Sequence, residues 1–110
     1  MTTSSDAKVT TGSGNVFADL GFKDAEDRLA RSELALELAR LIRARRLTQA
    51  AAAERLGIDQ PKVSRLMAGK LQGFSAEQLM RFLNALGCDI EIKVRERPRA
   101  KQGRLTVAVG

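Results

Sequence analysis

Four polar residues occupy the outer positions of one short segment and are the side chains of this sequence best suited to recognise a ligand. They are Gln60, Lys62, Ser64 and Arg65. Between them stand Val63 and Leu66, three residues apart, which would face a core if the segment is helical. A glutamine amide matches adenine, an arginine guanidinium matches O6 and N7 of guanine, and a lysine binds guanine or a phosphate. The segment therefore predicts contact with base edges in a major groove, with Gln60 and Arg65 as the main readers.

The surrounding stretch (48–69), TQAAAAERLGIDQPKVSRLMAG, has the spacing of two short helices that meet at a tight turn. Ala53 is small enough to let two helices cross closely, and Gly57 tolerates the left-handed conformation that such a turn needs. The pattern predicts a helix-turn-helix with helices at about 48–56 and 60–68.

Residues at the ends of these two helices are expected to contact phosphates, because the N–H groups at a helix N-terminus favour an anion and basic side chains attract one. They are Arg46, Thr48, Gln49 and Lys70. One recognition helix makes few contacts, so we expect a homodimer that binds an inverted repeat in double-stranded DNA, with half-sites about 34 Å apart.

Six positions of the stretch match the spacing of one family. They are Gln49, Ala53, Gly57, Gln60, Val63 and Leu66. They fall where phage-repressor-type (Xre/Cro-like) DNA-binding domains place them, and the chain resembles that family. The alternative is an αα-hairpin in an ordinary helical bundle, which a lone alanine and glycine at this spacing would favour. Six matched positions followed by a basic residue favour DNA binding.

The composition narrows the possible functions. Residues 1–39 carry four basic and seven acidic side chains, whereas residues 40–110 carry fifteen basic and six acidic ones, which suggests a nucleic-acid-binding body behind an acidic front. The chain has no histidine and one cysteine, which excludes imidazole bases, internal disulfides and multi-thiolate zinc sites. We therefore expect no enzyme, cofactor or metal site. No apolar run reaches membrane-spanning length and no hydrophobic signal core is present, so we expect a cytoplasmic protein.

The N-terminal part contains apolar residues that the expected core does not use. A flexible tail is expected over residues 1–14, followed by the apolar run NVFADLGF and a long helix over about 23–46. The core stripe of that helix leaves two leucines on its opposite side. Either the apolar run folds over these leucines or another protein covers them, and we favour a partner-binding surface within residues 15–47. Its residues are Phe17, Leu20, Phe22, Leu29 and Leu36.

The C-terminal part changes from helical to strand periodicity. A Ser-x-x-Gln capping box at Ser75 opens a fourth helix that should end before Gly87. After it, apolar and polar residues alternate twice within residues 88–110, which predicts a β-hairpin that covers the core or serves in dimerisation. The expected fold class is mainly α, a phage-repressor-like bundle of four to five helices. Residues 15–87 would form the DNA-binding domain, and a C-terminal β-strand or hairpin would follow it.

The flanks of the helix-turn-helix narrow the resemblance. Together with the central motif, the runs NVFADLGF and FSAEQLMRFLNALGCDIEI look like the Xre-type antitoxins of type II toxin–antitoxin modules, the HigA-like partners of RelE/HigB-type ribonuclease toxins. The resemblance implies that the protein binds and silences such a toxin and represses its own operon as a dimer. The alternative is a free-standing or phage-derived Xre-type regulator without a toxin.

Overall fold

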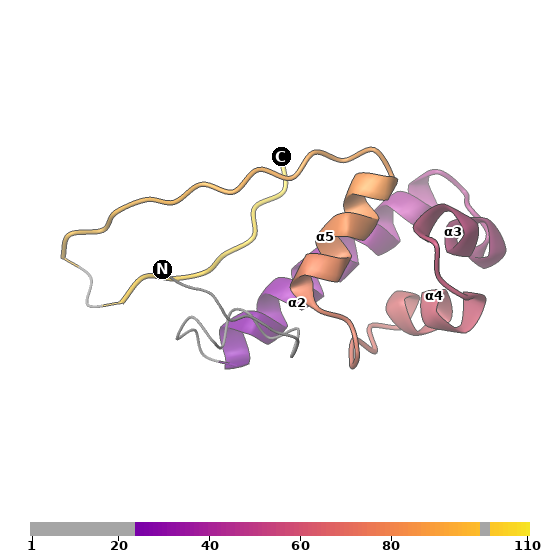
Figure 1. The fold of residues 1–110 in the computed structure, drawn as a ribbon, viewed down its shortest axis with the longest axis horizontal. Coiled ribbons are helices and arrows are strands. Elements are labelled where there is room, and N and C mark those ends of the chain that lie inside the picture. The colour runs from indigo at the N-terminus through magenta and orange to yellow at the C-terminus, as the bar shows by residue number, and fades with distance from the viewer. Residues whose placement is uncertain (1–23, 100–101) are drawn as a thin grey trace.

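The computed structural model describes residues 24–99 and 102–110, and Figure 1 shows the helices within them. They are α2 (Asp24–Ala44), α3 (Gln49–Leu56), α4 (Gln60–Met67) and α5 (Ala76–Ala85). The expected tail over residues 1–14 and the apolar residues Phe17, Leu20 and Phe22 lie outside the described residues.

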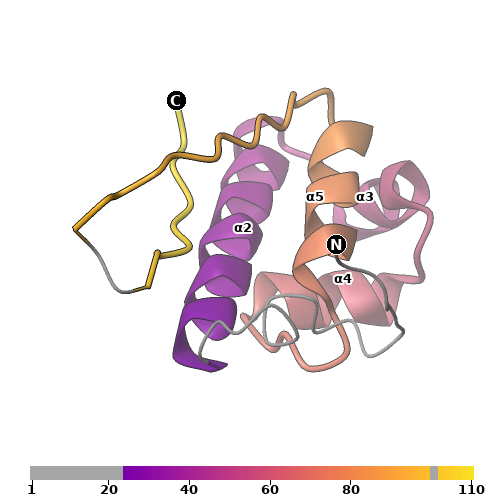
Figure 2. The same cartoon turned by 60° about the vertical axis from the view of Figure 1, so that its left-hand side comes forward.

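Helix α2 is the longest described helix, and α5 lies along it (Figure 2). Acidic residues in the first turn of α2 and Arg43 in its last turn match the polarity of the helix dipole. Its inward face repeats at helical spacing, and Ala30, Leu34, Leu38 and Ile42 are buried as that spacing predicts. This face packs on α5, so the two helices form the part of the core that supports the shorter pair.

Helices α3 and α4 pack against the pair formed by α2 and α5 (Figures 1 and 2). Their inward side chains join one apolar cluster with α2 and α5, and Val63 and Leu66 of α4 are 0% and 1% exposed. Helix α5 begins at the predicted capping box, in which Ser75 and Gln78 bond each other's backbone N–H groups. The helical bundle predicted from the sequence is thus confirmed.

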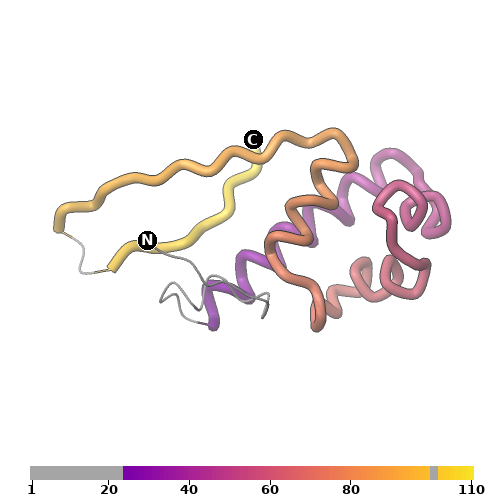
Figure 3. The backbone as a smooth tube through the Cα atoms, viewed as in Figure 1, coloured from indigo at the N-terminus to yellow at the C-terminus, as the bar shows by residue number. Residues whose placement is uncertain are grey.

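The C-terminal hairpin is not present in the described part of the chain. Residues 88–99 and 102–110 form two extended segments that run away from α3 and α4 (Figures 1 and 3), and no strand is formed within them. Ile90 and Val107 each pack on the helical core, and the backbone N–H of Leu105 donates to Oε2 of Glu26 at 3.2 Å. Each segment is thus held separately by the helices, and other alternating apolar residues, Ile92 and Val94, remain exposed without a ladder between the segments.

Candidate nucleic-acid interface

The turn between α3 and α4 sets the angle at which α4 is presented. Gly57 has φ 73° and ψ 29°, a left-handed conformation, and its N–H donates to the carbonyl of Ala53 at 2.9 Å. Ala53 is buried in the apolar cluster that α3 and α4 share, where a larger side chain would need more room. The two small residues therefore have the roles that their spacing predicts.

Helix α4 presents a polar outer face. Asp59 caps it, because its Oδ1 accepts a hydrogen bond from the Lys62 N–H at 3.0 Å, and Pro61 occupies the first turn, where no N–H is needed. The four predicted base-reading residues are all exposed. They are Gln60, Lys62, Ser64 and Arg65. With Val63 and Leu66 buried, the predicted readers lie on the face of α4 that a duplex could approach.

The predicted phosphate-contacting residues lie at neighbouring helix ends and are all exposed. They are Arg46, Thr48, Gln49 and Lys70. The Oγ1 of Thr48 accepts the Ala51 N–H at 3.0 Å, which leaves the hydroxyl proton free to donate to an anion. Gln49 is the first residue of α3, where unpaired backbone N–H groups favour negative charge.

Arg65 is placed differently from the other predicted readers. Its guanidinium carbon lies 5.5 Å from the centre of the Phe74 ring, and its Nη2 donates to the carbonyl oxygen of Gln72. The side chain therefore lies against the loop between α4 and α5. A guanidinium has five N–H donors, so Arg65 keeps donors for a base while this loop orients it.

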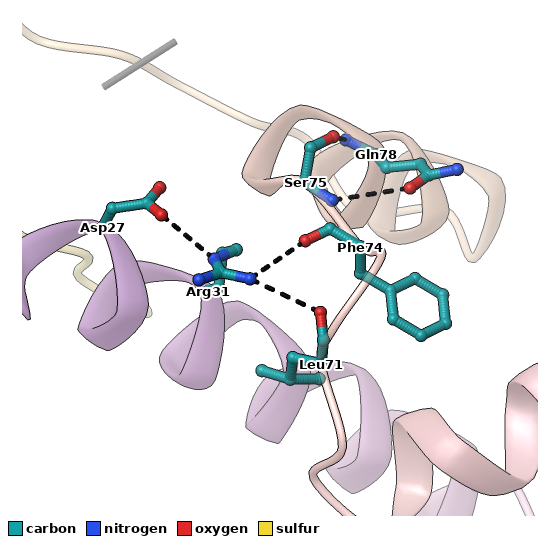
Figure 4. A network of polar contacts seen from close by, with 6 residues as sticks. All are labelled: Asp27, Arg31, Leu71, Phe74, Ser75 and Gln78. Atoms are coloured by element: carbon teal, nitrogen blue, oxygen red, sulfur yellow. Dashed lines mark hydrogen bonds and ion pairs between the residues drawn. The ribbon is translucent and has the colours of Figure 1, made fainter. Parts of the chain in front are cut away.

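The same loop is held from α2 by a residue that the sequence reasoning did not single out. Arg31 Nη1 donates to the carbonyl oxygens of Leu71, at 3.4 Å, and Phe74, at 3.3 Å (Figure 4). Its Nε lies 3.2 Å from Oδ2 of Asp27, a carboxylate that is almost completely buried. No sequence signal marks this contact, because the partners are 40 and 43 residues apart and the acceptors are backbone carbonyls.

Helix α2 carries a second exposed surface, which is apolar, whereas the outer face of α4 is polar. Leu29 and Leu36 are 57% and 68% exposed, so neither joins the core. Beside Leu36, Arg40 makes two hydrogen bonds to the carboxylate of Glu37, at 2.9 and 2.6 Å. These hydrogen bonds lower the pKa of Glu37 below its ordinary value and raise the pKa of Arg40. We call Leu29 and Leu36 the leucine stripe, an exposed apolar surface that the Arg40–Glu37 ion pair borders.

No helix within residues 24–99 and 102–110 is long and apolar enough to cross a membrane. The same residues contain no group of three or more histidine, cysteine, aspartate or glutamate side chains that could hold a metal ion.

Two capped helices joined by a left-handed turn, the second with a buried apolar face and a polar outer face, define the helix-turn-helix class. A family model described as "Helix-turn-helix domain" matches residues 16–95. A solved structure described as "Putative XRE Family Transcriptional Regulator" is 50% identical, with a TM-score of 0.75, and the match covers 80% of this chain and 100% of that chain. The comparison with curated proteins gave no match. The chain belongs to the Xre-like helix-turn-helix family.

Proposed function

We propose that this protein is a sequence-specific DNA-binding transcriptional repressor that inserts α4 into the major groove of its operator. The observation that carries the proposal is the outer face of α4, where exposed hydrogen-bonding side chains stand over a fully buried Val63 and Leu66. Family membership and the similar regulator structure support the same function. The regulator acts as a homodimer on an inverted repeat, since one helix of this length contacts few base pairs.

Base reading is assigned to Gln60, Lys62, Ser64 and Arg65. Gln60 stands at the start of α4, which enters the groove first in this class, and its amide suits adenine. Arg65 reads guanine with the donors that the loop leaves unused, so its orientation is set before DNA binds. Phosphate contacts from the neighbouring helix ends fix the register of α4 on the duplex.

The test is a binding titration of the full chain against the DNA upstream of its own gene and against unrelated duplex. Gln60→Ala should weaken operator binding by about 1–3 kcal/mol and relax one base position, whereas Lys70→Ala should weaken binding to all sequences and reduce the salt dependence by about one ion. Arg81→Ala is the matched control, because Arg81 is an exposed arginine on α5 paired with Glu77. Equal affinity for operator and unrelated DNA would contradict the proposal.

We further propose that the repressor is an antitoxin that neutralises a RelE/HigB-type ribonuclease toxin. Support comes from the leucine stripe, since a helix packed on one side of a small bundle has no structural need for two leucines more than half exposed. The excess of acidic over basic side chains in residues 1–39, seven against four, suits a basic, RNA-cleaving partner. Phe17, Leu20 and Phe22 extend this proposed partner-binding surface in sequence.

Co-expression with the product of the neighbouring gene tests this role. The wild-type chain should relieve growth arrest, and Leu29→Ser with Leu36→Ser should lose toxin binding while keeping operator affinity. Glu77→Ser with Arg81→Ser is the matched control, because both residues are exposed on α5 and not on the leucine stripe of α2. If the wild-type chain left growth arrest unrelieved, the protein would instead be a free-standing regulator, the second function compatible with its fold.

A further inference from the structure

The segment that follows α5 exposes an unusual amount of apolar surface. Ile92 and Val94 are 75% and 95% exposed, whereas Ile90, two residues earlier, packs on the helical core. We call residues 88–96 the first arm. Its alternation places Ile90, Ile92 and Val94 on one face and four charged residues, at positions 89, 91, 93 and 95, on the other.

Beyond Cys88, the backbone of the first arm is extended and makes no backbone hydrogen bond within the described chain. Its last backbone contacts are those of Cys88, whose N–H donates to Leu83 and whose carbonyl accepts from Asn84. No backbone hydrogen bond joins residues 89–99 to residues 103–110 as described. An extended segment of this kind has the open donors and acceptors of a sheet edge, which another strand can pair with.

The charges of the first arm identify the strand that fits it. If two copies pair antiparallel with Ile92 opposite Ile92, then Glu91 stands opposite Lys93 of the other copy and Asp89 stands opposite Arg95. The same register places Ile90 opposite Val94, so apolar residues face one another from position 90 to position 94. By two-fold symmetry every pair occurs twice except that of Ile92, which lies on the axis.

Neighbouring registers keep some opposite-charge pairs, Asp89 with Lys93 or Glu91 with Arg95, but each also sets a like-charge pair at its axis. A two-fold axis at residue 91 would place Glu91 opposite Glu91, and an axis at residue 93 would place Lys93 opposite Lys93 and Ile90 opposite Glu96. Like charges directly opposite one another destabilise a strand pair. A shift by one residue would set apolar side chains opposite charged ones. The sequence of the arm therefore selects one self-pairing.

We propose that the first arm pairs antiparallel with the first arm of a second copy, with the two-fold axis at Ile92. This pairing rests on the proposed function, because operator binding requires a dimer and the paired arms would form it. The pairing leaves α4 free, since the extended segments run away from α3 and α4 (Figure 1).

The proposed pairing would place the partner strand beside a hollow in the protein. A hollow of about 980 Å³ lies between the extended segments and the helices, with Ala30, Leu34 and Met80 among the residues that line it. The proposed register brings the partner strand's valine at position 94 opposite Ile90, where the arm meets the core. Apolar side chains exposed in one copy would thus become covered in two, which favours association.

Disulfide crosslinking without DNA or toxin tests the register. In a Cys88→Ala background, Ile92→Cys should form a covalent dimer under mild oxidation, because directly opposed residues have Cα atoms about 4.5–5.5 Å apart, within disulfide range. Val94→Cys is the matched control, since it would lie about 13 Å along the strands from its own copy. Equal crosslinking of both variants, or no crosslinking with Ile92→Cys, would overturn the proposal. If the first arm paired with residues 103–110 or with another protein instead, Ile92→Cys would not crosslink.

Charge exchange gives an independent test through the dimer dissociation constant, measured by light scattering or sedimentation. Glu91→Lys and Lys93→Glu should each weaken the dimer roughly tenfold, because each creates two like-charge pairs. The double variant should return to within about threefold of wild type. Failure of this rescue, or a monomeric wild type, would overturn the arm pairing. Operator binding by α4 is measured separately, so its failure remains distinguishable.

Discussion

The guanidinium carbon of Arg65 lies 5.5 Å from the centre of the Phe74 ring, which joins the outer face of α4 to the loop that precedes α5. The Phe74 ring in turn meets the Phe82 ring of α5 edge-on, with centroids 6.2 Å apart. Since Arg31 of α2 binds the carbonyl of the same Phe74, three helices converge on one loop residue. The orientation of the proposed recognition helix therefore depends on contacts outside the helix-turn-helix itself.

Arg31→Ala should lower the free energy of unfolding by about 1–3 kcal/mol, because it removes hydrogen bonds to two loop carbonyls and leaves the buried Asp27 carboxylate without its partner. Urea denaturation measures the change. Arg28→Ala, an exposed arginine on the same helix, should stay within about 0.5 kcal/mol of wild type. Equal effects of the two substitutions would show that the loop does not depend on Arg31.

Arg65→Ala should weaken operator binding by about 1–3 kcal/mol and relax preference at one base pair, and it should also destabilise the fold by about 0.5–1 kcal/mol through the lost contact with Phe74. A titration against operator variants and a urea denaturation separate the two effects. Unchanged affinity and unchanged base preference together would mean that Arg65 only holds the loop.

Thr48→Ala should cost about 1 kcal/mol of stability, because the Ala51 N–H loses its acceptor at the start of α3. It should also weaken binding equally for operator and unrelated duplex, since a phosphate contact carries no sequence information. Thr48→Ser keeps the hydroxyl and is the control, expected close to wild type in both urea and DNA titrations. A loss confined to the operator would indicate base contact by Thr48 instead.

The helices were predictable because their signals are local. Thr48, Asp59 and Ser75 each cap the helix that follows within three residues, and the buried stripe of α2 repeats every three or four positions. The spacing of α4 likewise predicted which side chains face outward. It could not show that Arg65 turns toward Gln72, because helical spacing gives a face of the helix and not the direction of a long side chain.

The parts that could not be predicted depend on distant partners. The contact of Arg31 with Leu71 spans 40 residues and has no periodic signal. Alternation of Ile90, Ile92 and Val94 predicted an extended backbone, but a strand also needs a neighbour, and periodicity does not say which segment that neighbour is. The described chain does not supply it, and this is why the predicted hairpin is absent from residues 88–99 and 102–110.

Gly57→Ala isolates the backbone requirement of the turn between α3 and α4. A Cβ added at Gly57 would meet no heavy atom within 4 Å, so the cost comes from holding an L-residue at φ 73° and should be about 1–2 kcal/mol. Gly57→Asn should lose less, because asparagine adopts this conformation more readily. Urea denaturation of the three proteins ranks them. If the turn sets the angle of α4, the alanine variant should also bind operator more weakly at temperatures where it is fully folded. An affinity equal to wild type at those temperatures would show that the turn contributes only to stability.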